Sequence, residues 1–232
     1  MKMNHRMRGG FTLVELLVVI VIIAALAGLT APMVIRQRKK ADQTEAVNNA
    51  RQIGIALFEF ETEYGSFPDD DTAQTVASNT DTTAVSGQTA NDRFRQLIRA
   101  GIAQSEPMFY CKTSYTKKPD GVFNTDEQAL GKGEVGFGIM MNSNGSGLSA
   151  SGNPSRPIVM APFANGLSGE KFDFDVYDGK AVFLKLDNSV TSLPIVKSSG
   201  LVKISGKNLT QTGEDTVWGT DLTPALAYPE SK

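Results

Sequence analysis

Cysteine and histidine are almost absent from this chain of 232 residues, which contains one of each, Cys111 and His5. A single cysteine excludes an intrachain disulfide even in an oxidising compartment, and Cys111 is predicted to be a small buried hydrophobic residue. His5 lies within the first ten residues, and without these residues the chain has no histidine to act as general base or zinc ligand. The glycine-rich segment 142–147 lacks the ending of a phosphate loop, so it is predicted to be a flexible connection. An enzyme is therefore not expected.

The chain also lacks a clear excess of charge of either sign, with 23 basic and 25 acidic residues. Removal of residues 1–10 would take away Lys2, Arg6 and Arg8, which leaves 20 basic residues against 25 acidic ones. Because binding to nucleic acid relies on a basic surface, no nucleic-acid partner is expected.

Charge is almost missing from a 21-residue apolar run, Phe11 to Ala31, in which Glu15 is the only ionisable side chain. A helix of this length reaches roughly 30 Å and crosses the hydrocarbon core of a bilayer, whereas the apolar part of a signal peptide is shorter. The run is therefore predicted to span a membrane. A carboxylate at that depth costs roughly 3 kcal/mol, so Glu15 is expected to have a functional partner. Basic residues flank the run on both sides and leave its orientation open.

Helical patterning continues beyond the apolar run. Pro32 lacks a backbone N–H, so it is expected to kink or locally unwind the helix without ending it. An apolar stripe with 4-3-4-3-4 spacing follows, which predicts an amphipathic second half that packs on a sheet. The stripe consists of Ala46, Ala50, Ile53, Leu57, Phe60 and Tyr64. One long helix is therefore predicted from Phe11 to Tyr64, with Gly65 and Pro68 as its stop.

The rest of the chain, residues 65–232, is predicted to be a globular head with helix first and sheet afterwards. Residues 69–90 are polar and are predicted to form a solvated or partly disordered loop. A short helix capped by Asn91 or Asp92 should run to Ala100. Strands are expected at 108–112, 135–141, 158–160, 181–186, 190–196 and 201–204, with a hairpin turn at Asp187–Asn188. Order in the polar tail from residue 206 stays open. The fold class is thus α+β, a lollipop whose long helix carries a small antiparallel sheet.

The N-terminal string Gly9-Gly10-Phe11-Thr12-Leu13-Val14-Glu15-Leu16-Leu17 resembles the class III prepilin signal of type IV pilins and type II secretion pseudopilins. A short basic leader precedes it, and Pro32 interrupts the helix where such proteins often carry a proline. The resemblance implies that a prepilin peptidase cuts between Gly10 and Phe11 on the cytoplasmic side and that the new Phe11 amine is methylated. It also implies four segments: a leader at 1–10, a membrane and filament-core helix at 11–31, its amphipathic half at 32–64, and an extracytoplasmic head at 65–232.

The resemblance further implies a homopolymeric filament that starts from the inner membrane, as a single-pass protein with its head in the periplasm. In the filament the Glu15 carboxylate of one chain can meet the Phe11 ammonium of its neighbour, and this attraction rises as the local dielectric falls. The implied partners are other copies of the chain, prepilin peptidase, the inner-membrane assembly platform, and minor pilins or pseudopilins.

A second segment, Tyr64-Gly65-Ser66-Phe67-Pro68, resembles the one that closes this helix in major pseudopilins. Together with the unpaired Cys111, it favours the pseudopilus of a type II system that drives protein export across the outer membrane. One alternative is a type IV pilin of a surface pilus that serves adhesion, motility or DNA uptake. An alternative of another class is a signal-anchored periplasmic binding module that works as a monomer.

No cofactor is required by this interpretation, but a turn-rich stretch places Asp173, Asp175 and Asp178 close together in sequence. Oxygen-rich clusters suit calcium, and major pseudopilins often bind a structural calcium in their C-terminal region, so a calcium site is weighed here against ordinary turn aspartates. The basic cluster of the short helix is predicted to be a solvated face with ion pairs rather than a phosphate site. This cluster consists of Arg93, Arg95 and Arg99.

Overall fold

The computed structural model describes residues 12–123 and 129–232, which fall into two compact units. The described residues up to Arg38 form the first unit, and Lys39–Lys232 form the second. Helix α1, Leu13–Tyr64, contributes its first part to one unit and its second part to the other.

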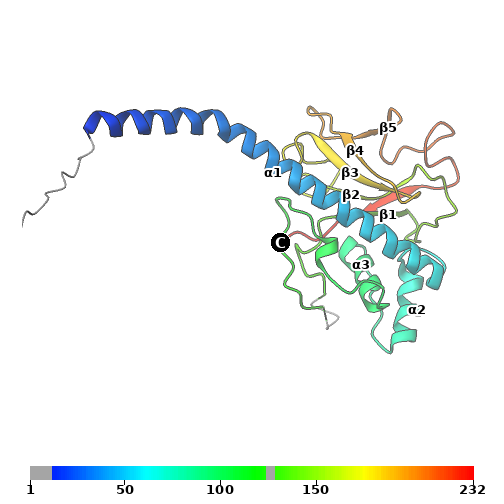
Figure 1. Cartoon of the computed structure of the whole chain (residues 1–232). Coiled ribbons are helices and arrows are strands. Elements are labelled where there is room, and N and C mark those ends of the chain that lie inside the picture. The colour runs from blue at the N-terminus through cyan, green and yellow to red at the C-terminus, as the bar shows by residue number, and fades with distance from the viewer. Residues whose placement is uncertain (1–11, 124–128) are drawn as a thin grey trace, which may run out of the picture. The chain divides into compact units, whose positions relative to one another are not determined.

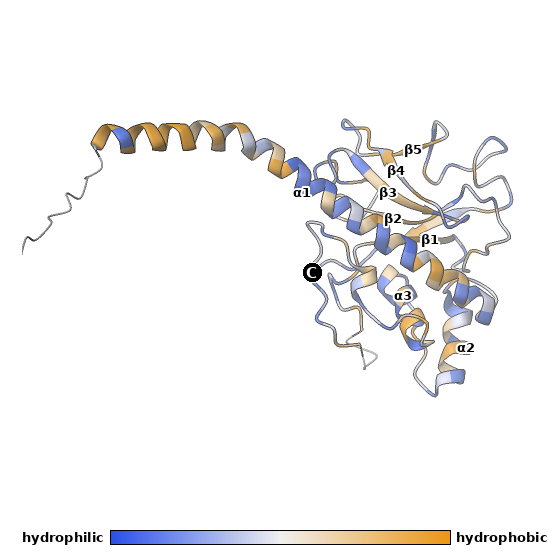
Figure 2. Ribbon diagram, in the orientation of Figure 1, coloured by the Kyte–Doolittle hydropathy of each residue, from blue (hydrophilic) through white to orange (hydrophobic). Residues whose placement is uncertain are grey.

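The first unit is the apolar part of α1. Every described residue of this unit is exposed, and Figure 2 shows an almost continuous hydrophobic surface along it, with one hydrophilic turn near its start. The helix continues through Pro32, so the proline does not end it. The long helix predicted from the sequence is therefore confirmed, and a kink at Pro32 stays a prediction.

The second unit is an α+β domain, as predicted. Its helices are the second part of α1, α2 (Asp70–Thr80), α3 (Ala90–Arg99) and the short 3-10 helix η1 (Pro107–Phe109). An antiparallel sheet has the strand order β4-β3-β2-β1-β7, and two short strands pair separately. The strands are β1 (Gly138–Asn142), β2 (Pro157–Ala161), β3 (Lys180–Lys185), β4 (Val190–Pro194), β5 (Lys203–Ile204), β6 (Lys207–Asn208) and β7 (Pro224–Ala227). Figure 1 shows the second part of α1 crossing the sheet, with α3 beside the helix.

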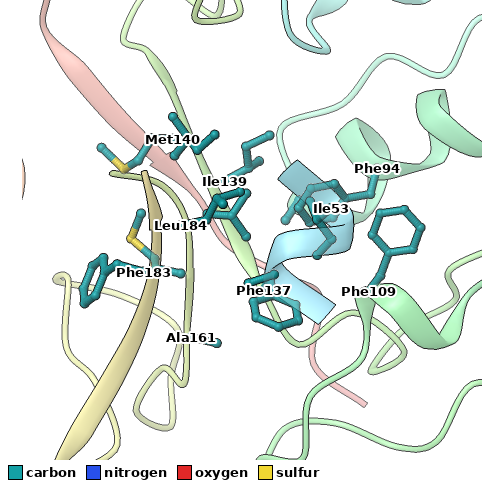
Figure 3. Packing of buried hydrophobic residues seen from close by; sticks show 14 of the residues in the cluster. Ile53, Phe94, Phe109, Phe137, Ile139, Met140, Ala161, Phe183 and Leu184 are labelled. Carbon is teal, nitrogen blue, oxygen red and sulfur yellow. The ribbon is translucent and has the colours of Figure 1, made fainter. Parts of the chain in front are cut away.

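The apolar stripe of α1 forms one side of the core. Ile53, Leu57 and Phe60 have no exposed surface, as the 3-4 spacing predicts. Strand pairing places Ile139 opposite Val159 and Val159 opposite Leu184, so these side chains share one face of the sheet. In Figure 3, Ile139 and Leu184 extend towards Ile53, whereas Met140 and Phe183 extend away from it. The helix therefore covers the face that carries Ile139 and Leu184.

The opposite face of the sheet is covered by the loops that follow β2. The Phe183 ring lies 5.3 Å from the ring of Phe172, which in turn stacks on Phe163 at 5.3 Å. Because both faces are covered, every residue of β2 is buried. The strand therefore has a continuous apolar sequence, which is typical of a strand inside a core.

The predicted hairpin is confirmed between β3 and β4. Leu184 pairs with Val190, and the turn contains Asp187 and Asn188. Asn188 has φ 61°, a left-handed conformation that asparagine tolerates better than most residues. The Ser189 N–H donates to Asp187 Oδ1 at 2.9 Å, which fixes the turn.

The predicted loop at 69–90 is wrong over half its length, because residues 70–80 form helix α2. A capping box starts this helix: the Thr72 N–H donates to Asp69 Oδ1 at 2.7 Å, and the Asp69 N–H donates to Thr72 Oγ1 at 2.8 Å. Ala73 and Val76 are each 1% exposed and anchor the helix on the core. The segment is therefore a helix attached to the core, although its polar composition indicated a loop.

One further expectation needs correction, and one open question is answered. Residues 108–112 do not form a strand: η1 begins at Pro107, and Gly136 N–H donates to Phe109 O as an isolated contact rather than as part of a ladder. The sequence leaves the order of the tail beyond residue 206 open, and the structure shows that its residues 224–227 pair with β1 as the edge strand β7.

Helix α3 starts two or three residues earlier than the expected cap at Asn91 or Asp92 implied. Its cap is Thr89, in a capping box with Asp92, and the Asn91 side chain instead donates to Leu130 O at 2.8 Å. The prediction of a solvated basic face is wrong for Arg93, which is fully buried and pairs with Asp70 at 2.8 Å. The predicted ion pairs are confirmed for Arg93 and also for Arg95, which pairs with Asp92 at 2.7 Å.

Candidate membrane-anchor and assembly site

The first turn of α1 contains one acidic residue, Glu15, whose side chain forms a capping box with Thr12. The Thr12 N–H and the Thr12 hydroxyl both donate to Glu15 Oε2 at 2.8 Å, and the Glu15 N–H donates to Thr12 Oγ1 at 3.3 Å. This arrangement satisfies free N–H groups of the first turn and places the carboxylate at the positive end of the helix dipole. In the described part of the chain no lysine or arginine pairs with Glu15. The predicted cationic partner of Glu15 is therefore not among the described residues of the chain.

Large apolar side chains cover all sides of the first part of α1. Their exposed fractions range from 46% at Val19 to 81% at Leu13. The most apolar window of α1 has a mean hydropathy of 2.8, and this helix is long enough to cross a membrane. Such a continuous apolar surface is not stable in water, so lipid or other protein helices must cover it.

The structure does not describe the predicted cleavage site. Gly10 and Phe11 both lie outside the described residues. Cleavage between them, methylation of Phe11 and the pairing of its amine with Glu15 stay predictions. Sequence reasoning missed Thr12, although a threonine three residues before a glutamate at a helix start is the signature of a capping box.

The three aspartates considered for calcium are local turn residues. Asp173 Oδ1 accepts a hydrogen bond from the Asp175 N–H at 2.9 Å, and Asp178 has φ 52° in the turn before β3. They do not form a group of carboxylates within 4.8 Å of one another in the described part of the chain. Because calcium needs several oxygens around one point, this loop does not fit a preformed site. Calcium there stays a prediction, which fails if a chelator leaves the thermal stability of the chain unchanged.

A different set of acidic side chains does come together. Carboxylate oxygens of Glu106, Asp120 and Glu134 lie within 4.8 Å of one another. Glu106 accepts from the N–H groups of Gly121 and Leu130, each at 2.9 Å. Burial, and then the neighbouring charges of Glu134 and Asp120, raise the pKa of Glu106 above its ordinary value of 4.5.

A lysine already neutralises part of this acidic group. Lys117 Nζ lies 3.1 Å from Glu134 Oε1, and the other oxygen of Glu134 accepts from the Gly131 N–H at 2.7 Å. The three carboxylates therefore organise the loops between η1 and β1.

Cys111 is a buried core residue, as predicted. It is 1% exposed, and burial raises the pKa of its thiol to about 12. A thiol with so high a pKa is not a nucleophile at neutral pH.

Comparison with known proteins identifies the family of this chain. The family model of the prokaryotic N-terminal methylation motif matches residues 5–31, which include Glu15 and the whole apolar run. Type II secretion system core protein G of Aeromonas hydrophila is 32% identical over 135 residues, which cover 58% of this chain and 80% of that protein. The chain belongs to the core protein G family of pseudopilins.

Two further core protein G sequences resemble the chain. That of Pectobacterium carotovorum is 28% identical over 134 residues, covering 57% of this chain and 72% of the relative. That of Pseudomonas aeruginosa is 35% identical over 66 residues, covering 28% of this chain and 46% of the relative. No solved structure matches significantly. Membership of the core protein G family agrees with a membrane-anchored structural subunit whose long apolar helix leads into an α+β head.

Proposed function

We propose that this pseudopilin is the repeating subunit of a type II secretion pseudopilus and that it drives protein export across the outer membrane. The observation that carries the proposal is the single carboxylate, Glu15, at the start of the otherwise uncharged and exposed apolar part of α1 in a member of the core protein G family. A monomeric anchor has no need of such a group, because a buried charge is costly. A filament uses it to pair with a neighbouring subunit.

The proposed assembly begins with a single-pass chain in the inner membrane, its head in the periplasm. Prepilin peptidase cuts between Gly10 and Phe11 and methylates the new amine. The inner-membrane platform and minor pseudopilins then draw the chain into the filament. There the Phe11 ammonium of one subunit takes the place of the Thr12 donors at Glu15 of the next. The pair sets the axial register even if its net stabilisation is modest. The role is mechanical and needs no cofactor or enzymatic group.

Mass spectrometry of the membrane protein tests the processing step. The chain should begin at methylated Phe11. A chain that retains residues 1–10 and stays monomeric would contradict the filament and support the signal-anchored binding module.

Substitutions at the start of α1 separate charge from helix capping. Glu15→Leu and Glu15→Gln should both abolish incorporation into filaments, because neither provides a negative charge. Thr12→Ala is the matched control, since it removes the capping contacts and keeps the carboxylate, and it should assemble normally. The head should stay folded in all three variants. Normal assembly of Glu15→Gln would show that charge is not required.

Deletion of the protein distinguishes a secretion filament from a surface pilus. Exported enzymes should accumulate in the periplasm, whereas surface fibres, twitching and DNA uptake should be unaffected. The opposite pattern would assign the chain to a type IV pilus.

A further inference from the structure

An open apolar groove lies between α1 and the turn that joins β3 to β4. It has a volume of about 440 Å³ and is lined by Ile55, Phe58, Leu186, Asp187 and Asn188. Ile55 is 56% exposed, and among the described residues of α1 after Ile35 it is the only exposed large hydrophobic side chain. The groove therefore offers an apolar surface that this chain leaves uncovered.

Acidic side chains surround the groove. Glu59 lies one helical turn after Ile55, Glu63 one turn further, and both are exposed. Asp187 lines the opposite wall, and its hydrogen bonds from Ser189 lower its pKa, which keeps it ionised at neutral pH. Lys185 is a basic residue whose charge also acts on Asp187, and Arg51 lies one turn before Ile55 on α1.

The two glutamates are unfavourably placed within the isolated chain. They are like charges four residues apart on one helix face, which destabilises a helix. They also lie near the C-terminal end of α1, where the helix dipole is negative, and the last turn of α1 contains no basic residue. A cation from outside this chain would relieve both effects.

The same chain contains a segment with complementary chemistry. Met33, Val34 and Ile35 are 65%, 50% and 57% exposed, and a basic cluster follows them directly. The cluster consists of Arg36, Arg38, Lys39 and Lys40. None of these four side chains has an ion-pair partner within the described ranges. The segment is thus apolar and then basic, whereas the groove is apolar with an acidic rim.

We propose that the groove binds the segment Met33–Lys40 of a second copy of the chain. The apolar residues cover Ile55 and Phe58, and the basic cluster pairs with Glu59, Glu63 and Asp187. The contact must be intermolecular, because Lys40 and Ile55 are fifteen residues apart on one helix, or about 22 Å. This inference rests on the proposed function, since it assigns a lateral contact of the filament that is separate from the pairing of Glu15.

Disulfide crosslinking in the full-length chain tests the contact. Ile55→Cys is combined in turn with Met33→Cys, Val34→Cys or Ile35→Cys, in cells that assemble the filament. Native Cys111 can stay, because it is buried. The matched control combines the same stalk cysteines with Ser198→Cys, an exposed site beyond the far end of β4. At least one Ile55 pair should give about tenfold more dimer than its control, the ratio for a preference of ~1.4 kcal/mol.

Charge reversal tests the electrostatic part. Glu59→Lys with Glu63→Lys should reduce filament yield about tenfold, equivalent to ~1.4 kcal/mol. Addition of Arg36→Glu and Lys40→Glu in the same chain should restore the yield. Measured yields of sheared filament and the thermal stability of the head separate assembly from folding.

The outcomes distinguish this inference from the proposed function. If filaments form but the Ile55 pairs crosslink no better than the Ser198 pairs, the groove contact is overturned and the pseudopilus stands. If reversal of the basic cluster alone blocks assembly and reversal of the glutamates does not, the basic segment serves the membrane surface, which also overturns the contact. If the unmodified chain forms no filament, both proposals fail.

Discussion

Arg93, Glu106 and Glu134 are charged residues of the head with at most 1% of their surface exposed. Burial of a charge costs free energy unless the group is paired or hydrogen-bonded. Each of these residues has an ion-pair or hydrogen-bond partner at least 15 residues away in the sequence: Asp70 for Arg93, Gly121 and Leu130 for Glu106, and Lys117 for Glu134. The Glu106 carboxylate, for example, binds the N–H of Leu130. Arg93 therefore connects α3 to α2, whereas Glu106 and Glu134 connect the loops between η1 and β1.

Removal of the carboxylate at Asp70 should destabilise the head through Arg93. Asp70 is the only acid paired with this buried guanidinium among the described residues, and Arg93 Nε and Nη2 have no hydrogen-bond partner there. Asp70→Asn should lower the free energy of unfolding by about 2 kcal/mol, less than for a fully buried pair because the Asp70 side chain is 51% exposed. Urea unfolding of the detergent-solubilised chain measures this change. Asp71→Asn, an exposed neighbour in the same helical turn, should change stability by less than about 0.5 kcal/mol. Equal effects of the two substitutions would refute the role of the pair.

Glu106 should make stability depend on pH. Its folded-state pKa lies above the ordinary value of 4.5, so in the interval between the two values the folded chain binds more protons than the unfolded chain. The contribution of Glu106 to stability is therefore full below pH 4.5 and is lost as the pH rises through the raised pKa. Glu106→Gln removes this titration and also loses a backbone hydrogen bond. The free energy of unfolding of the Glu106→Gln variant should thus lie furthest below that of the unmodified chain near pH 4, and the difference should shrink towards pH 7. A deficit that stays constant across this range would contradict the assignment.

At the scale of elements, α1 and the β3–β4 hairpin approach each other closely at Gly54. A Cβ at this position would overlap Asn188 Oδ1 and come within 3.0 Å of Leu184 Cδ1. The same turn lines the groove proposed for a second copy. The glycine therefore sets the distance between helix and hairpin.

Gly54→Ala should destabilise the head even though alanine favours a helix. Overpacking costs about 1–3 kcal/mol, and the gain in helix propensity offsets roughly 1 kcal/mol of it. Asn188→Gly in the same chain should recover most of the loss, because glycine removes the overlapping atom and accepts φ 61°. Gly28→Ala serves as control, since nothing lies within 4 Å of its Cβ position. Thermal unfolding followed by circular dichroism distinguishes the three variants, and a stabilised Gly54→Ala chain would disprove the close approach.

Helix α2 shows why composition can mislead at the element scale. Its sequence is rich in aspartate and threonine, and it also contains serine and asparagine, residues that favour turns and loops. The start signal was nevertheless present as Asp69 followed by Thr72, and Ala73 and Val76 supplied a small apolar face. The helix forms because Gln96 of α3 binds Thr72 and the Asp69 carbonyl, each at 2.8 Å. That support is not visible within residues 69–90.

At the scale of the molecule, the C-terminal tail fastens distant parts of the head. Strand β7 pairs with β1 along four residue pairs. Beyond it, Ala90 N–H donates to Tyr228 O at 2.8 Å and Gly133 N–H to Glu230 O at 2.8 Å. The tail thus connects the sheet edge, the start of α3 and the loop before β1.

Deletion of residues 224–232 should therefore destabilise the whole head. Loss of several long-range backbone hydrogen bonds, at about 1 kcal/mol each, predicts a loss of at least ~3 kcal/mol. It also exposes the edge of β1, which favours aggregation. Denaturant unfolding together with light scattering measures both effects. Glu230→Ala keeps the backbone contacts and should have nearly normal stability, so an equally large effect there would point to the side chain instead.

The sequence by itself determined the anchor and its chemistry: the apolar helix, its amphipathic continuation to Tyr64, the hairpin at Asp187–Asn188 and the lone carboxylate at Glu15. These features follow from hydropathy, periodicity and short motifs, which depend on residues close together in the chain. Only the tertiary structure decided that 70–80 is a helix, that the tail adds β7, that Arg93 is buried, and that carboxylates cluster at Glu106, Asp120 and Glu134 but not at Asp173, Asp175 and Asp178. Each of these depends on contacts between residues far apart in sequence, and no local pattern specifies such contacts because many distant partners satisfy the same local preferences.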